Sequence, residues 1–185
     1  EISLKGNHNL ENALFIIGTG KILNIPNELI AQFLKTTKAL EHRLENFFLK
    51  KNTLFVNDSK GTNVESTVKA IEAFKNKVVL IAGGENKKIC NDELIKKINE
   101  RVGFVYLIGE TGTILAEEMD KVGYKKYKNL GTLEKVLLDI RENIDFEDGQ
   151  TILFSPATAS FDQFKNFEER GRIFKELTNK ILGEK

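Results

Sequence analysis

Residues 77–84 read Lys77-Val78-Val79-Leu80-Ile81-Ala82-Gly83-Gly84, an apolar run that stops at a pair of glycines. Such a continuous run is typical of a strand that is buried on both faces. Comparable runs occupy residues 103–108 and 151–154, and amphipathic segments separate them. Apolar strands that alternate with helices predict a mostly parallel sheet with helices on both faces. The sequence therefore predicts an α/β fold with a Rossmann-like domain.

The remaining elements follow from the same change of pattern along the chain. A β-hairpin is expected from strands at 43–49 and 53–57, and a weak strand near 124–127. The helices of the sheet domain are expected at 63–74, 92–100, 111–119, 132–143 and 162–181. Two further helical patterns, at 9–23 and 27–36, precede the first strand. We therefore expect a helical part over residues 1–40 and a Rossmann-like domain over 41–185.

Composition excludes several classes of protein. The 28 basic and 27 acidic residues of this 185-residue chain nearly balance. The composition therefore lacks the excess positive charge that is typical of proteins that bind nucleic acid or an anionic membrane. No apolar run is long enough to span a bilayer, and no signal-peptide pattern opens the chain. The single Cys90 suits a reducing cytoplasm and is interpreted as a bystander thiol. Because the chain starts at Glu1 and its only methionine is Met119, we expect a piece of a longer protein.

Residues 155–171 form the most informative polar stretch, directly after the apolar run at 151–154. Ser160 stands where a helix N-cap is expected, and Gln163 follows at capping-box spacing. A helix that began there would direct free N–H groups and its positive dipole end to the carboxyl end of a strand. That is a common place for an α/β protein to bind an anion.

Two other strand ends, at 57–63 and 83–88, are also rich in polar side chains. Parallel strands bring their carboxyl ends to one edge of a sheet, so these side chains are expected to share a crevice. The candidates are Lys60, Thr62, Lys87 or Lys88, and Ser160. Ammonium groups, hydroxyls and helix ends together suit a carboxylate or a phosphate. The alternative, that the lysines are solvated loop residues, remains open from the sequence.

Other polar and aromatic positions allow more than one interpretation. Asp58 is either a turn-forming residue or a ligand contact near a nucleotide ribose or a metal. Phe161 and Phe167 either pack in the core or reach the mouth of the crevice. His8 and His42 are too few and too far apart to predict a metal cluster, so no metal site is predicted.

Two searches for nucleotide-binding motifs fail. No G-x-x-x-x-G-K-[ST] is present, since Gly18-Thr19-Gly20-Lys21 lacks the spacing and lies within a predicted helix. No G-x-G-x-x-G follows the first strand. The chain is therefore not expected to be a self-sufficient NTPase or a dinucleotide-dependent oxidoreductase.

Several runs of the sequence are nevertheless similar to those of a known family. They are Gly6-Asn7-His8-Asn9 with Asn12-Ala13, Leu40-Glu41-His42-Arg43-Leu44-Glu45, and Asn57-Asp58-Ser59-Lys60-Gly61-Thr62-Asn63. Together they resemble the Mur ligases of peptidoglycan synthesis. The runs at 57–63 and 155–171 further resemble those of the members that add D-glutamate.

The resemblance implies a domain organisation and an activity. Mur ligases have a UDP-binding domain, a central ATPase domain and a C-terminal Rossmann-like domain. Residues 1–40 would be a helical remnant of the central domain, and 41–185 the C-terminal domain. Members use ATP and Mg²⁺ to activate a carboxylate as an acyl phosphate, which the amino acid then attacks. The implied partners are ATP, D-glutamate and UDP-N-acetylmuramoyl-L-alanine, and this fragment alone is expected to be inactive.

The resemblance also implies roles for single residues. ATP would be bound by Asn9, Asn12, Arg43 and Asp58, with the arginine towards phosphate and the aspartate towards the ribose. D-Glutamate would be bound by Lys60, Thr62, Lys87, Ser160, Phe161 and Phe167. No catalytic residue is assigned, and Gly61 stands where alanine is common in the family.

Two alternatives remain open from the sequence. One is a related Mur or folylpolyglutamate-type ligase with another amino-acid substrate. The other is a non-enzymatic Rossmann-like interaction module, whose polar strand ends are only loops.

Overall fold

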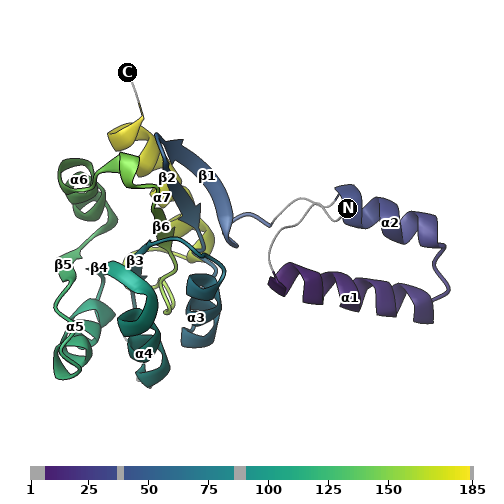
Figure 1. Ribbon diagram of the computed structural model, residues 1–185, viewed down its shortest axis with the longest axis horizontal. Helices are drawn as coiled ribbons and strands as arrows, with labels where there is room; N and C mark the ends of the chain where they lie inside the picture. The colour runs from purple at the N-terminus through teal and green to yellow at the C-terminus, as the bar shows by residue number, and fades with distance from the viewer. Residues whose placement is uncertain (1–6, 37–39, 86–90, 184–185) are drawn as a thin grey trace. The chain divides into compact units, whose positions relative to one another are not determined.

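The chain divides after Leu40 into two units in this computed structural model, which describes residues 7–36, 40–85 and 91–183 (Figure 1). The first unit is a pair of helices, α1 (Asn7–Ile22) and α2 (Asn27–Thr36). Both helices lie close to where the sequence predicts them. Whether this pair belongs to the central domain of a longer ligase stays a prediction.

The helical pair buries few apolar side chains. Its small core consists of Ala13, Ile30 and Leu34, with Ile16 and Ile17 packed against it. Large apolar side chains remain exposed on both helices and the turn between them: Leu14, Phe15, Ile22, Leu23, Leu29 and Phe33. An apolar cavity of about 550 Å³ opens between the two helices.

The second unit is built on a six-stranded sheet. Its strands are β1 (Glu45–Lys50), β2 (Thr53–Asn57), β3 (Val78–Gly83), β4 (Val102–Ile108), β5 (Tyr127–Gly131) and β6 (Thr151–Phe154). They lie in the order β1-β2-β6-β3-β4-β5. Only the β1–β2 hairpin is antiparallel among the described pairs, and every other pair is parallel. The predicted α/β fold with a mostly parallel sheet is confirmed.

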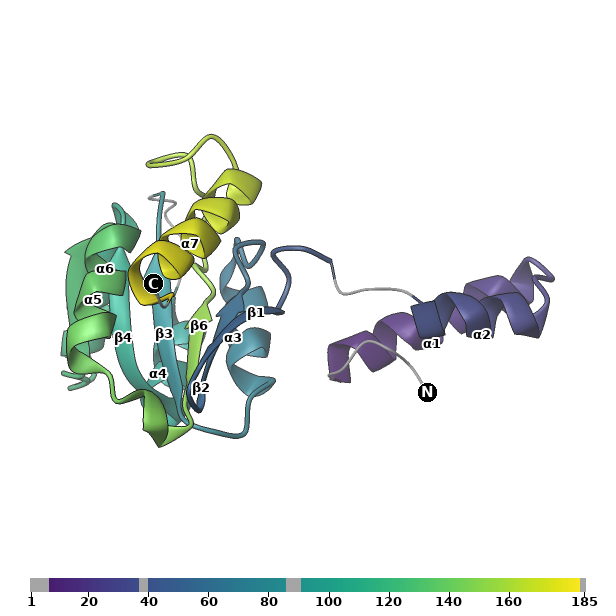
Figure 2. The same cartoon turned by 90° about the horizontal axis from the view of Figure 1, so that it is seen from above.

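Helices cover both faces of this sheet, as Figure 2 shows. They are α3 (Val64–Glu72), α4 (Asp92–Arg101), α5 (Thr111–Lys121), α6 (Leu133–Asn143) and α7 (Phe167–Leu182), with a short 3₁₀ turn at Phe146–Asp148. The apolar sides of α3, α4 and α5 pack on one face, and those of α6 and α7 pack on the other. None of the helices in the described part of the chain is long and apolar enough to cross a membrane.

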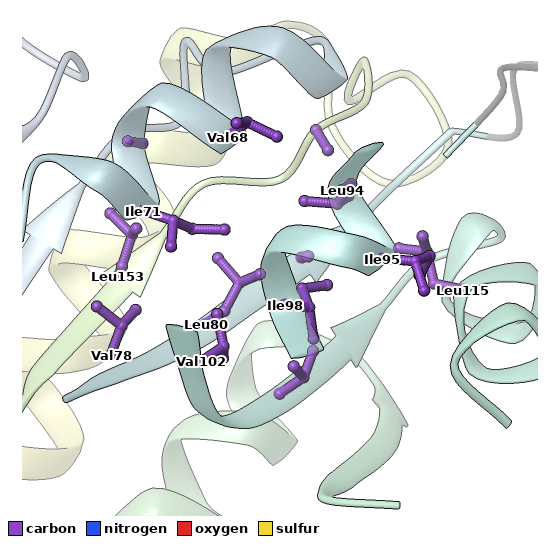
Figure 3. Packing of buried hydrophobic residues seen from close by; sticks show 14 of the residues in the cluster. Val68, Ile71, Val78, Leu80, Leu94, Ile95, Ile98, Val102, Leu115 and Leu153 are labelled. Carbon is purple, nitrogen blue, oxygen red and sulfur yellow. The ribbon is translucent and has the colours of Figure 1, made fainter. Parts of the chain in front are cut away.

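Strand β3 shows how the sequence divides the core into two. Val78 and Leu80 pack towards α3 and α4, as Figure 3 shows, whereas Val79 and Ile81 pack towards α6 and α7. All four are almost completely buried. Because successive residues of a strand point to opposite faces, a strand with helices on both sides must be apolar throughout. This is the pattern that residues 77–84 carry.

Strand β5 begins later than the sequence predicts, at Tyr127 rather than near Tyr124. The Tyr124 ring is buried among α4, α5 and the sheet, and its hydroxyl donates to the carbonyl of Val102 over 3.1 Å. A buried tyrosine whose hydroxyl is hydrogen-bonded is stable outside a strand. The apolar character of Tyr124 therefore did not indicate that it belongs to β5.

Helix α7 begins at Phe167, so the prediction of a helix from Asp162 with Ser160 as N-cap is wrong. Asn166 is the N-cap, and its side chain accepts from the N–H of Glu169 over 2.8 Å. The carbonyl of Ser160 instead accepts from the N–H groups of two turn residues, Gln163 and Phe164. Ser160 with Gln163 and Asn166 with Glu169 have the same capping-box spacing, so the local sequence does not distinguish the two caps.

Helix α3 shows a smaller shift of the same kind. Its N-cap is Asn63, which accepts from the N–H of Ser66 over 2.8 Å, so the helix begins at Val64 and not at residue 63 as predicted. The asparagine amide oxygen satisfies a free N–H of the first turn, and this frees the Thr62 hydroxyl for other contacts.

Candidate functional site

Three loops meet at the carboxyl edge of the sheet, as the strand order requires. They follow β2, β6 and β3, which are parallel neighbours in that order. The N–H of Ala157 donates to the carbonyl of Gly61 over 2.9 Å. The N–H groups of Gly83 and Glu85 donate to the carbonyls of Pro156 and Ala159 over 2.8 and 3.0 Å. The loop at 155–160 is therefore held between the other two by main-chain hydrogen bonds.

A buried guanidinium, that of Arg170 in α7, holds two of these loops together. Its Nη1 donates to the carbonyls of Thr158 and Ala159 over 3.1 and 3.0 Å. Its Nη2 and Nε donate to the carbonyl and the hydroxyl of Ser59 over 2.8 and 3.1 Å. Arg170 is completely buried, and this burial lowers its pKa to about 10, with Asp162 and Asp58 opposing the change.

Arg170 is not among the site residues predicted from the sequence, although a signal for it is present. Phe167, Arg170 and Phe174 are spaced three and four residues apart, which places them on one side of a helix. An arginine in line with an apolar stripe must be buried or must distort the packing.

The carboxylate of Asp58 is also buried, directly after β2. Its Oδ1 accepts from the N–H of Leu44 over 3.1 Å, and its Oδ2 accepts from the hydroxyl of Ser155 over 2.6 Å. Burial raises the pKa of Asp58 to about 6, while the two hydrogen bonds and the charges of Arg43 and Arg170 act in the opposite direction. Arg43 itself is exposed, one residue before Leu44. The Leu44 N–H thus links the two positions that were predicted to bind nucleotide.

The predicted D-glutamate residues fall into two groups. Lys60 is exposed, and its Nζ lies 5.7 Å from the ring centroid of the half-buried Phe167, so the two are neighbours. Thr62 is half-buried in the same loop. Ser160 is buried and Phe161 is largely exposed in the adjoining loop. The structure therefore brings the loops of these five residues to one edge of the sheet.

The remaining predicted positions lie either outside the described residues or in the first unit. Lys87, Lys88 and Cys90 lie outside the described residues. Asn9 and Asn12 belong to α1 in the first unit, where Asn12 is exposed and the side chain of Asn9 lies outside the described part.

Main chain packs on main chain at the base of this edge. A Cβ atom on Gly84 would lie 2.5 Å from the carbonyl oxygen of Ala159 and 2.6 Å from the Thr158 hydroxyl. A Cβ atom on Gly109 would lie 2.6 Å from the Cα of Gly84. Any side chain at Gly84 or Gly109 would therefore push the loops apart.

One group of side chains close to the first strand has the geometry of a metal site. Ligand atoms of Glu41, His42 and Glu45 lie within 4.8 Å of one another. However, the Lys175 ammonium lies 2.7 Å from Glu41 and 2.8 Å from Glu45, so a cation of the protein already occupies this position. His42 is buried, which lowers its pKa, and its Nδ1 lies 2.9 Å from the side-chain amide of Asn57. These contacts fix the start of β1 and do not fit a resident metal.

Residues 42–158 match the family described as "Mur ligase, glutamate ligase domain". The chain belongs to the Mur ligase family. The matched Mur ligase segment contains Arg43, Asp58, Lys60 and Thr62, and it ends before Ser160.

A Mur ligase from Fusobacterium nucleatum, UDP-N-acetylmuramoylalanine–D-glutamate ligase, is 45% identical to this chain over 185 residues. The alignment covers 99% of this chain and 43% of that relative. The chain therefore spans less than half the length of this relative.

Two solved Mur ligase structures share the fold at low sequence identity. The UDP-N-acetylmuramate–alanine ligase MurC from Thermotoga maritima matches with a TM-score of 0.70 at 16% identity, over 97% of this chain and 39% of that one. The MurF ligase of the same organism, in complex with ADP, matches with a TM-score of 0.56 at 17% identity, over 89% and 37%. At these identities the likeness concerns the fold.

Proposed function

We propose that this chain is the D-glutamate-binding and ATP-gripping part of an ATP-dependent amide ligase. The longer enzyme would add D-glutamate to UDP-N-acetylmuramoyl-L-alanine in the cytoplasm of a bacterium. The observation that carries the proposal is the meeting of the loops after β2 and β6, held by the buried Arg170, in a chain whose close relative bears that enzyme's name.

The D-glutamate site would lie between these two loops. Lys60 would offer an ammonium group and Thr62 a hydroxyl from the loop after β2, and Ser160 would offer a hydroxyl from the loop after β6. The Lys60 ammonium lies over the Phe167 ring, and this contact restricts the positions that the ammonium group can adopt. A dicarboxylate needs cationic and hydroxyl donors placed apart, because its two charges repel each other. Lys87 is proposed as a second cation from its sequence position.

The residues present also fit a nucleotide. The Asp58 carboxylate is an acceptor suited to ribose hydroxyls, and the exposed Arg43 guanidinium is suited to a phosphate. ATP with Mg²⁺ would supply the phosphoryl group that activates the acceptor carboxylate. No described cluster offers Mg²⁺ free oxygen ligands, because the Glu41 and Glu45 carboxylates already bind Lys175. We therefore place metal binding on other parts of the longer enzyme.

This chain would position the reactants, and it would not carry the chemistry by itself. Its loops would hold the D-glutamate amine towards the activated carboxylate, and a well-placed nucleophile is worth several kcal/mol of barrier in such reactions. The isolated chain is accordingly proposed to bind but not to ligate.

Paired substitutions in the longer ligase test the proposal. Lys60→Ala and Ser160→Ala should each raise KM for D-glutamate about tenfold or more, because each removes a hydrogen bond to a charged ligand. Lys165→Ala, an exposed lysine of the same stretch, is the matched control and should leave KM unchanged. Unchanged KM for the first two variants would contradict the proposal. Preference for another amino acid over D-glutamate in competition would instead indicate a related ligase.

A further inference from the structure

A buried chain of hydrogen bonds runs behind the Asp58 carboxylate. The hydroxyl of Thr67 in α3 lies 2.9 Å from the hydroxyl of Ser155, which donates to Asp58 Oδ2 over 2.6 Å. On the other side, Asp58 Oδ1 accepts from the N–H of Leu44 over 3.1 Å. Thr67, Ser155 and Asp58 are all buried. We call this set of four residues the Asp58 relay.

The direction of the relay follows from the number of protons available. An ionised carboxylate only accepts hydrogen bonds, so Ser155 must give its single proton to Asp58. The Ser155 oxygen then has only lone pairs left, and Thr67 must donate to it. The Asp58 carboxylate is thus bound on both oxygens, and the order of donors holds it in one orientation.

Gly61 leaves the space that this arrangement needs. A Cβ atom at that position would lie 2.6 Å from Asp58 Oδ2 and 2.6 Å from the Ser155 hydroxyl oxygen. Real Cβ atoms do not approach this closely, so an alanine at 61 would displace one partner of the hydrogen bond. The glycine and the short 2.6 Å contact therefore depend on each other.

We propose that Ser155, with Thr67 behind it and Gly61 beside it, is a positioning residue that orients the Asp58 carboxylate and, through the Leu44 N–H, the main chain next to Arg43. The functional part rests on the proposed function, in which Asp58 and Arg43 contact nucleotide. Ser155 touches neither nucleotide nor amino acid in this scheme. It acts on both nucleotide residues through one carboxylate.

The first experiment is independent of any activity. The Asp58 carboxyl of the 185-residue chain is titrated by ¹³C NMR, in the wild type and in Ser155→Ala and Thr67→Val. Loss of a hydrogen bond to the charged form should raise the pKa of Asp58 by about one unit in Ser155→Ala, and by less in Thr67→Val. Thr158→Val is the matched control, because its buried hydroxyl is in the same loop and has no partner in the structure. Equal pKa values in Ser155→Ala and the control would overturn the relay.

The second experiment measures both substrates in the longer ligase. Ser155→Ala should raise KM for ATP about fivefold to tenfold, the loss expected for one weakened hydrogen-bonded group, with KM for D-glutamate changed less than twofold. Gly61→Ala introduces the residue that is common here in the family, so it should raise KM for ATP less than Ser155→Ala does. Its effect should shrink further in the Ser155→Ala background, where the Ser155 hydroxyl no longer contacts the added Cβ atom. Equal changes in both KM values would overturn the positioning role.

The two experiments separate the two ideas. If Asp58→Asn leaves KM for ATP unchanged, the proposed nucleotide role of Asp58 fails, whereas the NMR result still decides the relay. If the NMR shift is absent, the relay fails, whatever the kinetics show.

Discussion

The two units of this chain bury their apolar side chains to very different degrees. The α/β unit encloses two cores, one on each face of its sheet, and Leu80 in β3 is completely buried. In the helical pair, Phe15 and Ile22 are 77% and 81% exposed. The α/β unit therefore contains what it needs to be stable, and the site lies on it. The helical pair gains little from its own packing, since apolar burial is the main driving force of folding.

The chain carries its own reporters for this comparison. All three tyrosines, Tyr106, Tyr124 and Tyr127, lie in the α/β unit, and the sequence has no tryptophan. Near-ultraviolet circular dichroism of tyrosine thus follows the α/β unit, while far-ultraviolet signal at 222 nm, the usual helix wavelength, includes both units. Unfolding of the α/β unit in urea is therefore followed by the tyrosine signal.

The largest effect is expected at Arg170. Arg170→Leu should lower the free energy of unfolding of the α/β unit by about 3–5 kcal/mol, because buried carbonyls and two acids lose their cationic partner. Arg172→Leu, an exposed arginine of the same helix, is the control and should change it by less than about 0.5 kcal/mol. Similar losses in both variants would show that the guanidinium does not hold the loops.

The next effect contrasts the α/β unit with the helical pair directly. Leu80→Ala should lower the free energy of unfolding of the α/β unit by about 2–5 kcal/mol, because it leaves a cavity between the sheet and helices α3 and α4. Phe15→Ala, in the helical pair, should leave the tyrosine transition unmoved, because its side chain is mostly exposed. A shift of that transition in Phe15→Ala would mean that the two units unfold as one.

A pH effect of at most about 3 kcal/mol is expected from Asp58, whose pKa is raised to about 6. The folded chain binds this proton more tightly than the unfolded chain does. The contribution of Asp58 to stability is therefore fully present below about pH 4, and it is lost as the pH rises to about 6. Asp58→Asn should flatten the pH dependence of unfolding in this window. Glu28→Gln, at an exposed acid of the helical pair, should leave it unchanged.

The smallest effect is expected at the start of α7. Asn166→Ala should lower the free energy of unfolding by about 1 kcal/mol, the usual value of an N-cap. Lys165→Ala, at the neighbouring exposed residue, should leave it almost unchanged. If Ser160 were the cap, as the sequence predicts, Asn166→Ala would be as silent as its neighbour. Urea midpoints of the two variants distinguish the outcomes.

The sequence predicts the fold well where a pattern is repeated, and the site only in part. Residues 77–84 specify a central strand because both faces of it are covered, and the strand ends then meet for topological reasons. The start of α7 is different, since Ser160 and Asn166 offer equally good caps and only packing decides between them. The spacing of Arg170 with Phe167 and Phe174 indicates that its side chain is buried, but it does not indicate its partners. Ser155 contacts Asp58 and Thr67, which lie far away in the sequence, and no local pattern encodes such contacts.

The contact of main chain with main chain at Gly84 and Gly109 limits how this site can diverge. A side chain at either glycine would push the loops apart, so substitutions at Gly84 and Gly109 are not expected to be tolerated. A change in the accepted ligand must come from the rim, at positions such as Lys60 and the largely exposed Phe161. Selection for a new substrate in a library would therefore be expected to return replacements at the rim and to keep both glycines.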